Sequence, residues 1–407
     1  MNKDFLLGLE PKLADALEEF VFLFNMDAMR WAARLWDPIS GGFYYSNSAR
    51  DHEGFGADLE STAQILRVID DRGMIDSYGS MKKAMPEDIA DKLVAFADER
   101  LDEDGYFYHP QWGKNIGTSR RGRDLQWGRI IYKMFDKTPP RKTAVELLQG
   151  ADRPTITTLP EHLKSKKAFR EYLEAEYAAK ASYPLGHGIN AQMVQIEAAG
   201  LLEECCKFLD AKQNPGNGLW EEDITYRSVS GLMKLSVIYI RANRRMNFPE
   251  KVSDSIFTLL KSRDAVDQIV YIYNPLSALS QQIYTLNLVN ENYEAARLVS
   301  RLKEDAIDVV SIMTDKTRCF AKPDGSFSYS PEFSACRSQN VPSALKNTCE
   351  GDVNATTIAS GGIVSNLLTT LGFSAKTFDK EDFDEFISIV RAQKPAIKAP
   401  VPEGRMP

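Results

Sequence analysis

The stretch that decides the fold is KPDGSFSYSP, residues 322–331, in which a glycine stands between an acidic residue and an aromatic one. A polar or proline-containing lead, a glycine and an aromatic or apolar side chain follow in the same order in DPISGGFYYS (37–46), DEDGYFYHPQ (102–111) and NPGNGLWEED (214–223). Glycine reaches turn conformations that are costly for other residues. The chain therefore carries a repeated glycine–aromatic turn.

The spacing of these turns predicts a longer series of repeats. The anchoring glycines are Gly42, Gly105, Gly218 and Gly325. They are 63, 113 and 107 residues apart, and the two larger spacings are close to twice a unit of about 55 residues. Two further junctions are then expected, with residues 186–188 (GHG) and Asn274–Pro275 as candidates. The series predicts about six units of two helices each.

Between the turns, apolar residues recur every three or four positions, which is typical of helices with one buried face. Alternating patterns typical of strands are scarce, so the sequence predicts an all-α fold. The predicted helices are Pro11–Trp36, Leu59–Ile69, Ile89–Glu99, Leu163–Ala181, Ile189–Leu209, Tyr226–Ala242, Ser255–Ser262, Leu276–Leu288, Tyr293–Met313, Thr356–Leu371 and Lys380–Arg391. Helical hairpins cannot bury their apolar faces alone, so they either stack into a solenoid or close into a ring.

The domain organisation follows from the continuity of this pattern. Residues 1–392 are expected to form one domain, because the same turns continue past the proline- and threonine-rich stretch 136–160. That stretch is interpreted as a long excursion over one face of the protein. The tail, residues 393–407, contains four prolines and is expected to be disordered.

Composition excludes several classes of function. Of the 407 residues 43% are hydrophobic and 26% are charged, as in a globular chain, and the net charge of −7 gives no basic surface for nucleic acid or an anionic membrane. No apolar run of 18 residues and no signal peptide is recognisable, so we expect a cytoplasmic protein. The sequence leaves the oligomeric state open.

The cysteines favour neither a disulfide framework nor a metal site. Their number, five, is odd, and Cys205 and Cys206 are adjacent, so reduced thiols are expected. No CxxC pair occurs, and zinc sites are typically built from such pairs. We therefore expect no metal and no redox cofactor.

The turns and the helices after them resemble the α/α toroids over roughly residues 10–390. The matching stretches are GGFYYS with DLESTAQIL (58–66), DGYFYHPQW with RDLQWG (123–128), GLWEE with YRSVSGL (226–232), and DGSFSYS with EGDVNATTIA (350–359). Toroids include terpenoid cyclases, protein prenyltransferase β-subunits, six-hairpin glycosidases and the toroid domains of polysaccharide lyases. The resemblance implies a ring of about six helical hairpins whose inner helices begin at one shared cavity.

Two motifs bear on which toroid chemistry is expected. DVNAT, 352–356, is similar to the DxDDT motif of class II terpenoid cyclases, but Asn354 and Ala355 replace the second and third aspartates, so the proton donor of that family is missing. DGSF, 324–327, is similar to a turn of chondroitin-type lyases, although the histidine that follows in those lyases is absent. A terpenoid cyclase or a prenyltransferase-like protein stays an alternative.

Residues near the expected inner-helix starts supply the candidate site. Hydrolysis of a glycosidic bond needs two carboxyl groups, and we expect Asp58 or Glu60 to pair with Glu350 or Asp352, since the first and last units would be neighbours in a closed ring. β-Elimination needs a clamp for a uronate carboxylate and a base. The candidates for the base are His109, Tyr183 and His187. The candidates for binding substrate are Gln111, Trp112, Arg120, Arg121, Arg123, Asn190, Trp220, Tyr329 and Asn354.

These candidates combine aromatic faces, amides and arginines, which suit a sugar that carries carboxylates. The sequence therefore favours a carbohydrate-active enzyme that cleaves a glycosidic bond in an acidic, uronic-acid-containing oligosaccharide, by β-elimination or by hydrolysis. A toroid that binds a ligand without catalysis is the second hypothesis, because motifs such as DVNAT are degenerate.

Overall fold

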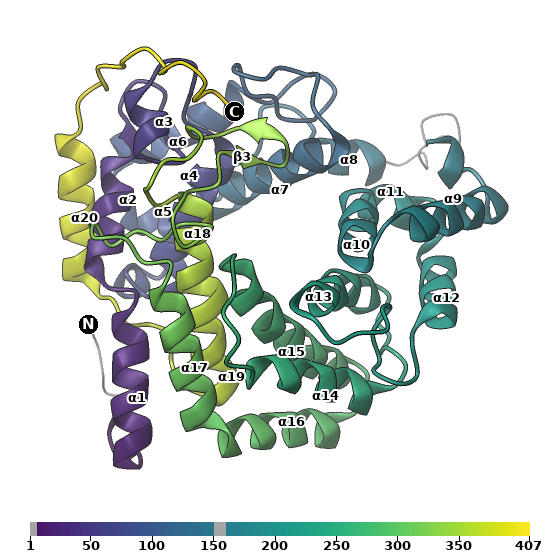
Figure 1. Cartoon of the computed structure of the whole chain (residues 1–407). Coiled ribbons are helices and arrows are strands. Elements are labelled where there is room, and N and C mark those ends of the chain that lie inside the picture. The colour runs from purple at the N-terminus through teal and green to yellow at the C-terminus, as the bar shows by residue number, and fades with distance from the viewer. Residues whose placement is uncertain (1–5, 150–159) are drawn as a thin grey trace. The chain divides into compact units, whose positions relative to one another are not determined.

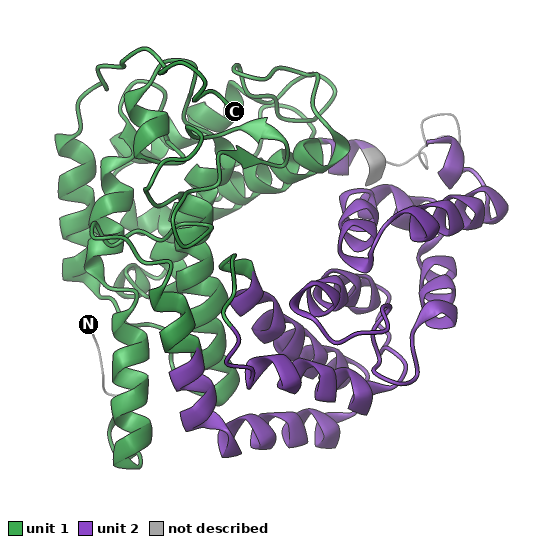
Figure 2. Ribbon diagram, in the orientation of Figure 1, with its two compact units in different colours: residues 1–143, 265–270, 313–407 green, residues 144–264, 271–312 purple. Residues whose placement is uncertain are grey.

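The structure is a computed structural model that describes residues 6–149 and 160–407. The described chain is mostly α-helical with a few two-residue strands, which confirms the all-α class (Figure 1). Its contacts divide it into two compact units (Figure 2). Unit 1 comprises residues 1–143, 265–270 and 313–407, and unit 2 comprises residues 144–264 and 271–312. The interpretation as a single domain stays a prediction.

Unit 1 contains the first and the last parts of the chain. Its helices are α1 (Pro11–Phe22), α2 (Met26–Arg34), α3 (Asn47–Asp51), α4 (Leu59–Asp71), α5 (Met81–Ala84), α6 (Glu87–Asp98), α7 (Thr118–Met134), α18 (Val353–Thr357), α19 (Asn366–Leu371) and α20 (Lys380–Ala392), with a 3-10 turn at Asp76–Tyr78 and a π-helical segment at Ile358–Ser365. Its strands form two antiparallel pairs, β1 (Trp36–Asp37) with β2 (Gly42–Phe43) and β3 (Arg337–Ser338) with β4 (Val341–Pro342). Helix α4 packs against α7 and α18, and α2 packs against α20.

All secondary-structure elements in the described residues of unit 2 are helices. Its helices are α8 (Ala144–Gln149), α9 (Lys166–Ala179), α10 (Ser182–Ala191), α11 (Met193–Ala198), α12 (Leu202–Lys212), α13 (Tyr226–Arg241), α14 (Pro249–Leu260), α15 (Val270–Leu288), α16 (Asn292–Glu304) and α17 (Ala306–Arg318), with a 3-10 turn at Glu161–Leu163. The first residue of α15 and the last six of α17 belong to unit 1. Helix α10 packs most extensively against α13.

Most predicted helices are present, but the longest ones are divided, the first of them at a polar cap. The predicted helix Pro11–Trp36 is two helices, because Asn25 turns the chain and accepts a hydrogen bond from Asp27 N at 2.8 Å, which caps α2. Helix α7, which is not among the helices predicted from apolar spacing, runs through a segment with four arginines and two glycines. The polar and glycine residues of α7 therefore weaken its apolar pattern, and packing against α4 and α6 stabilises the helix.

The two further junctions that the spacing predicts are not turns. Residues 186–188 lie inside α10, and Asn274–Pro275 lies inside α15. At Gly186 the missing side chain allows α13 to approach closely, since a Cβ there would lie 2.9 Å from Lys234 Cβ. This glycine is used for helix packing, so its presence alone does not indicate a turn.

The predicted excursion, residues 136–160, is described only in part. Its described residues include helix α8, and Asp136 pairs with Lys82 at 3.0 Å. Residues 150–159 of the excursion lie outside the described residues.

The glycine–aromatic turns share one backbone geometry in both units. Their glycines are left-handed, with φ of 77° at Gly41, 79° at Gly105, 73° at Gly218 and 86° at Gly325. In the first turn the left-handed glycine is thus Gly41, one residue before Gly42, which the sequence pattern indicated as the anchor. Residues with side chains adopt this conformation at a cost, which explains the glycine at each position.

Two of these turns are attached to the following helix in the same way. Phe43 N donates to Thr62 Oγ1 at 2.9 Å, and Asp58 N donates to Phe43 O at 3.2 Å. In the last turn, Phe327 N donates to Thr356 Oγ1 at 3.0 Å, and Asp352 N donates to Phe327 O at 2.9 Å. Asp58 caps α4 and Asp352 caps α18. These matching bonds support the repeat that the sequence indicates.

The turns also pack on helices in a regular order. A Cβ at Gly41 would lie 2.6 Å from Lys92 O in α6, and a Cβ at Gly218 would lie 2.6 Å from Val252 N in α14. Each of these helices follows its turn in the chain. A Cβ at Gly325 would lie 2.5 Å from Ala28 N in α2. The last turn therefore packs on a helix of the first repeat.

The proline-rich tail differs from the disorder expected of it. Ala399 N donates to Asp51 O at 2.8 Å, and Glu53 N donates to Ala399 O at 2.9 Å. Lys346 N donates to Arg405 O at 2.9 Å further along the tail. Proline cannot donate such bonds, but the residues between the prolines do, and they attach the tail to two loops of unit 1.

Among residues 6–149 and 160–407, no helix combines the length and the apolar character that crossing a bilayer requires.

Candidate functional site

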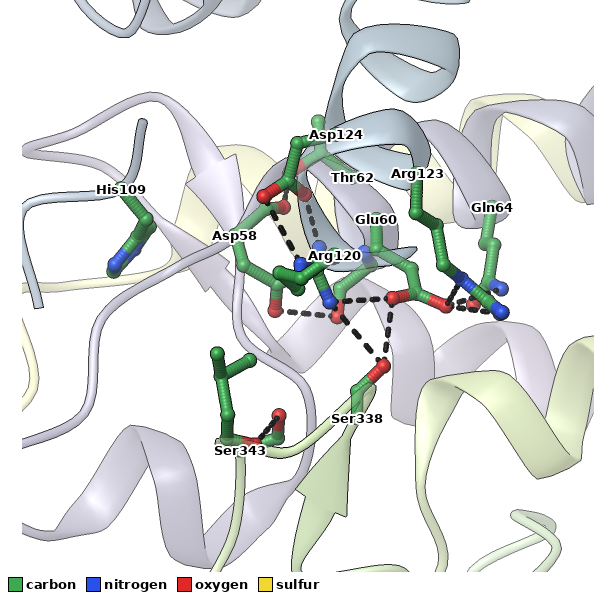
Figure 3. A network of polar contacts seen from close by, with 12 residues as sticks. Asp58, Glu60, Thr62, Gln64, His109, Arg120, Arg123, Asp124, Ser338 and Ser343 are labelled. Carbon is green, nitrogen blue, oxygen red and sulfur yellow. Dashed lines mark hydrogen bonds and ion pairs between the residues drawn. The ribbon is translucent and has the colours of Figure 1, made fainter. Parts of the chain in front are cut away.

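A group of charged and polar side chains gathers in unit 1 where α4 and α7 begin (Figure 3). We call Glu60, Arg120, Arg123, Asp124 and Ser338 the Glu60 cluster. Glu60 comes from the first turn of α4, the next three from α7, and Ser338 from strand β3. These residues are far apart in the sequence and are joined by hydrogen bonds and ion pairs.

Arg120 lies at the centre of the Glu60 cluster. Its side chain is 1% exposed, and its Nη1 donates to Glu60 Oε2 at 2.8 Å. Its Nε donates to Asp124 Oδ2 at 2.9 Å, one helical turn further along α7. Buried charges persist in proteins when they are paired and fully hydrogen-bonded, as here. Arg120 thus joins α7 to α4 and has no free face for a ligand.

Arg123 and Asn354 form the accessible edge of the cluster. Arg123 Nε donates to Glu60 Oε1 at 2.7 Å, while 25% of its side chain is exposed. Asn354 Oδ1 accepts from Arg123 Nη2 at 3.5 Å and from Gln64 Nε2 at 3.1 Å. The start of α18 therefore joins those of α4 and α7.

The hairpin β3–β4 covers part of this group. The Ser338 hydroxyl donates to Glu60 Oε2 at 2.8 Å and accepts from Arg120 Nη1 at 3.2 Å. Gln111 Nε2 donates to Pro342 O at 3.1 Å and so holds the other strand. One hydroxyl group thus lies between a buried carboxylate and a buried guanidinium.

The charges of the cluster are fixed by one another. Burial by itself would raise the pKa of Glu60, but Arg123 and Arg120 outweigh it and hold that pKa below its usual value. Burial opposes the charge of Arg120, yet Asp124 and Glu60 raise its pKa above the usual range. Burial raises the pKa of Asp124, against the effect of Arg120. Glu60 therefore stays ionised and is a poor proton donor.

His109 lies next to this group, stacked on Trp112 with ring centroids 4.1 Å apart. Its Nε2 is 2.7 Å from Ala57 O and so carries the proton, whereas Nδ1 accepts from Gln111 N at 3.1 Å. Burial lowers the pKa of His109 to about 3. Both ring nitrogens are engaged, so the geometry fits a neutral structural histidine better than a base.

Asp58 and Asp352 occupy equivalent places at the starts of α4 and α18. Asp58 Oδ1 accepts from Ser61 N at 2.9 Å, and Asp352 Oδ1 accepts from Ala355 N at 2.8 Å. Burial raises the pKa of Asp58 to about 6 and that of Asp352 to about 7. Both carboxyl groups act as helix caps, and both hold a proton more readily than an exposed aspartate does.

Glu350 lies close to the other end of the chain. Its Oε1 accepts from Ser48 Oγ at 2.5 Å, and its Oε2 accepts from Ser48 N at 2.8 Å. Burial raises the pKa of Glu350. Glu350 therefore contacts α3, and the pairing of Asp58 or Glu60 with Glu350 or Asp352 stays a prediction.

Two other candidates of unit 1 lie in separate environments. Arg121 is placed over the ring of Tyr106, with 4.9 Å between its Cζ and the ring centroid. The Tyr329 hydroxyl donates to Gln268 Oε1 at 3.3 Å.

The remaining candidates belong to unit 2. Tyr183 is 39% exposed, and its ring is parallel to that of His187 with centroids 6.4 Å apart. Asn190 Nδ2 donates to Lys234 O at 2.8 Å, and its buried Oδ1 has no hydrogen-bond partner. Trp220 is buried and donates from Nε1 to Leu209 O at 3.0 Å. The predicted site residues are thus divided between the two units and do not all come together.

In the part of the chain that the structure describes, no three histidine, cysteine or acidic side chains are grouped as a metal ion would require.

Sequence reasoning missed Ser338 and Gln64 as members of the site. Gln64 lies one turn after Glu60 on α4, so helical spacing could have indicated it. Ser338 lies in a segment without a helical pattern, and nothing in the sequence places it against α4.

The chain matches no known protein-family model, no curated protein and no solved structure. Its function is therefore argued from the site alone.

Proposed function

We propose that this chain is an α/α toroid that acts on carbohydrate. Four turns with the same left-handed glycine are followed by helices, as the repeat units of a toroid would be. The packing of the Gly325 turn on α2 supports closure, because it joins the last repeat to the first in the way that the Gly41 turn meets α6. A ring of about six hairpins accounts for both observations.

The Glu60 cluster is the proposed sugar-binding site. The observation that carries this proposal is the Ser338 hydroxyl, which is bonded to Glu60 at 2.8 Å and to Arg120 at 3.2 Å. A sugar hydroxyl also donates one hydrogen bond and accepts others, so it would bind in the same way at the accessible edge of the cluster, where Arg123 and Asn354 lie. Trp112 lies nearby and supports two members of this region, since His109 stacks on it with ring centroids 4.1 Å apart and Arg120 Cζ lies 5.4 Å from its ring centroid.

Arg123 favours an acidic sugar as the ligand. Its guanidinium is partly exposed and already oriented by Glu60, and guanidinium groups bind carboxylates with two parallel hydrogen bonds. A uronic-acid oligosaccharide offers both the carboxylate and the hydroxyl groups that this edge would take.

A titration of the full chain with uronic-acid oligosaccharides, followed by thermal shift and calorimetry, tests the binding. Arg123→Ala should weaken the binding at least tenfold, which corresponds to about 1.4 kcal/mol. Arg121→Ala is the matched control, since Arg121 lies on the same helix but over Tyr106. Equal effects of both substitutions, or no stabilisation by any oligosaccharide, would overturn the proposal.

A second candidate function is cleavage of the bound sugar. The raised pKa values of Asp58, about 6, and Asp352, about 7, favour it, because proton donors at neutral pH need such values. Elimination would yield an unsaturated product that absorbs at about 230 nm, hydrolysis would release reducing ends without it, and a binding protein would produce neither.

A further inference from the structure

The tail of the chain inserts one lysine into unit 1. Lys398 Nζ donates to Phe55 O at 2.6 Å, to Ala49 O at 3.2 Å and to His52 O at 3.3 Å. The same Nζ lies 4.5 Å from the centroid of the Tyr44 ring. All three N–H groups of the ammonium therefore have an oxygen acceptor, and an aromatic face borders the group.

The groups around Lys398 Nζ favour a cation. Carbonyl oxygens carry partial negative charge, and the face of an aromatic ring attracts cations. The direct contacts include no carboxylate, so a metal ion would find no charged ligand there, whereas an ammonium group finds one acceptor for each proton. Burial lowers the pKa of Lys398, and Asp37 and Asp51 oppose that effect.

We call the Tyr44 ring and the carbonyl groups of Ala49, His52 and Phe55 the cage. Hydrogen bonds that do not involve Lys398 hold the segments that carry these groups. Tyr44 N donates to Leu35 O at 2.9 Å, which fixes the aromatic wall. His52 Nδ1 lies 3.1 Å from Ser48 O, which holds the loop after α3. An ammonium group from another molecule would therefore meet a formed site.

The tail has a second attachment that is independent of the lysine. Arg405 Nε donates to Lys346 O at 2.7 Å, and its Nη2 donates to Thr348 Oγ1 at 2.9 Å. A change at Lys398 therefore leaves the far end of the tail anchored. This separation allows the cage to be emptied in the full chain.

We propose that Tyr44 and the carbonyl groups of Ala49, His52 and Phe55 form a binding site for a primary ammonium group, with Lys398 as its intramolecular occupant. Primary alkylamines are the class of ligand that this site takes when the lysine is absent or displaced. The tail then acts as a tethered competitor for that ligand.

The test is chemical rescue of Lys398→Ala in the full chain. Alanine keeps Cβ and removes the rest of the side chain, and n-propylammonium has the same atoms as the removed part. We expect this variant to melt at a lower temperature than the parent chain. We expect n-propylammonium to raise its melting temperature by about 2 °C at tenfold excess over its Kd, and further with the logarithm of the amine concentration. The parent chain, whose cage is filled, should show no such gain.

Three comparisons make the outcome specific. Lys394→Ala changes an exposed lysine of the same tail and should show no saturable response to the amine. Lys398→Met keeps most of the stem without the charge, so the amine should not rescue it. 1-Propanol, which lacks the charge, should not stabilise Lys398→Ala as n-propylammonium does. An equal response of the Lys394 and Lys398 variants, or equal effects of alcohol and amine, would overturn the proposal.

Discussion

Glu60 shows how one buried carboxylate organises its surroundings. It is fully buried, yet it accepts hydrogen bonds from two arginines and one serine. The arginines stabilise the ionised form of Glu60. Arg120 in turn needs a negative charge beside it, because its side chain is 1% exposed and water cannot solvate its charge. The loss of Glu60 would therefore leave the arginines with fewer partners in a dry environment.

The first prediction concerns this carboxylate. Glu60→Gln should lower the free energy of unfolding by about 3–5 kcal/mol, because it removes one of the two carboxylates that compensate the buried Arg120 and the carboxylate that pairs with Arg123. Chemical denaturation with urea measures the change. Asp88→Asn is the control, since the exposed pair of Asp88 with Arg391 at 3.0 Å should contribute at most about 1 kcal/mol. A loss for Glu60→Gln no larger than the control loss would contradict this account.

The second prediction concerns pH. Burial raises the pKa of Asp352 from its ordinary value of 3.8 to about 7, so the folded chain binds this proton over a range in which the unfolded chain has released it. The stabilisation is complete below pH of about 4 and is lost as pH rises towards 7, at a rate on the order of 1 kcal/mol per pH unit. Urea titrations at several pH values should show that slope.

Asp352→Asn tests the source of the slope. Asparagine can still cap α18 but does not titrate, so the fall in stability between pH 4 and 7 should become shallower. A residual slope is expected from Asp58, whose pKa is raised in the same direction to about 6. An unchanged slope in the variant would show that Asp352 titrates normally.

At the scale of elements, the repeated turn is the main device of the fold. The turns at Gly41, Gly218 and Gly325 combine a left-handed glycine with a close approach to a helix, and a Cβ at Gly325 would lie 2.5 Å from Ala28 N. Backbone geometry and packing both require glycine there, so the sequence signal is strong and regular.

The third prediction compares two glycines with similar backbone conformations. Gly325→Ala should lower the free energy of unfolding by about 2–4 kcal/mol, because it adds a steric clash to the left-handed strain. Gly79→Ala should cost about 1 kcal/mol, since φ there is 77° but no atom lies within 4 Å of the added Cβ. Thermal and urea denaturation measure both, and equal losses would show that the contact with α2 does not matter.

The elements also show how much of the fold could be predicted from the sequence. The helices and turns followed from apolar spacing and from glycine, because both signals are local. The junctions expected at Gly186 and Pro275 failed for the same reason: a glycine or proline inside a helix looks like one in a turn. Ser338 was missed because its contact with Glu60 depends on a pairing of segments that no local pattern encodes.

At the scale of the whole molecule, unit 1 is discontinuous in the sequence. Residues 1–143 and 313–407 share one compact unit, and residues 144–264 and 271–312 form the other. A closed ring of repeats predicts that both unfold together, whereas independent units would unfold separately.

The fourth prediction tests this cooperativity. Differential scanning calorimetry of the full chain should give one transition with equal calorimetric and van't Hoff enthalpies. Trp220 reports on unit 2, so the fluorescence difference between the parent chain and Trp220→Phe should follow the same melting curve as the calorimetric signal. Two separated transitions would contradict the single-domain interpretation.

The packing of the Gly325 turn on α2 also bears on how the chain is made. Helix α2 cannot contact the Gly325 turn until the ribosome has added residues 144–312, which takes roughly ten to thirty seconds at common elongation rates. During that delay α4 can pack on α2 through Ile65 and Val68, but the part of α2 that contacts the Gly325 turn and α20 has no native cover, so the nascent chain offers that part to chaperones. Helix α2 is therefore synthesised early, but it is among the last elements to complete its native contacts.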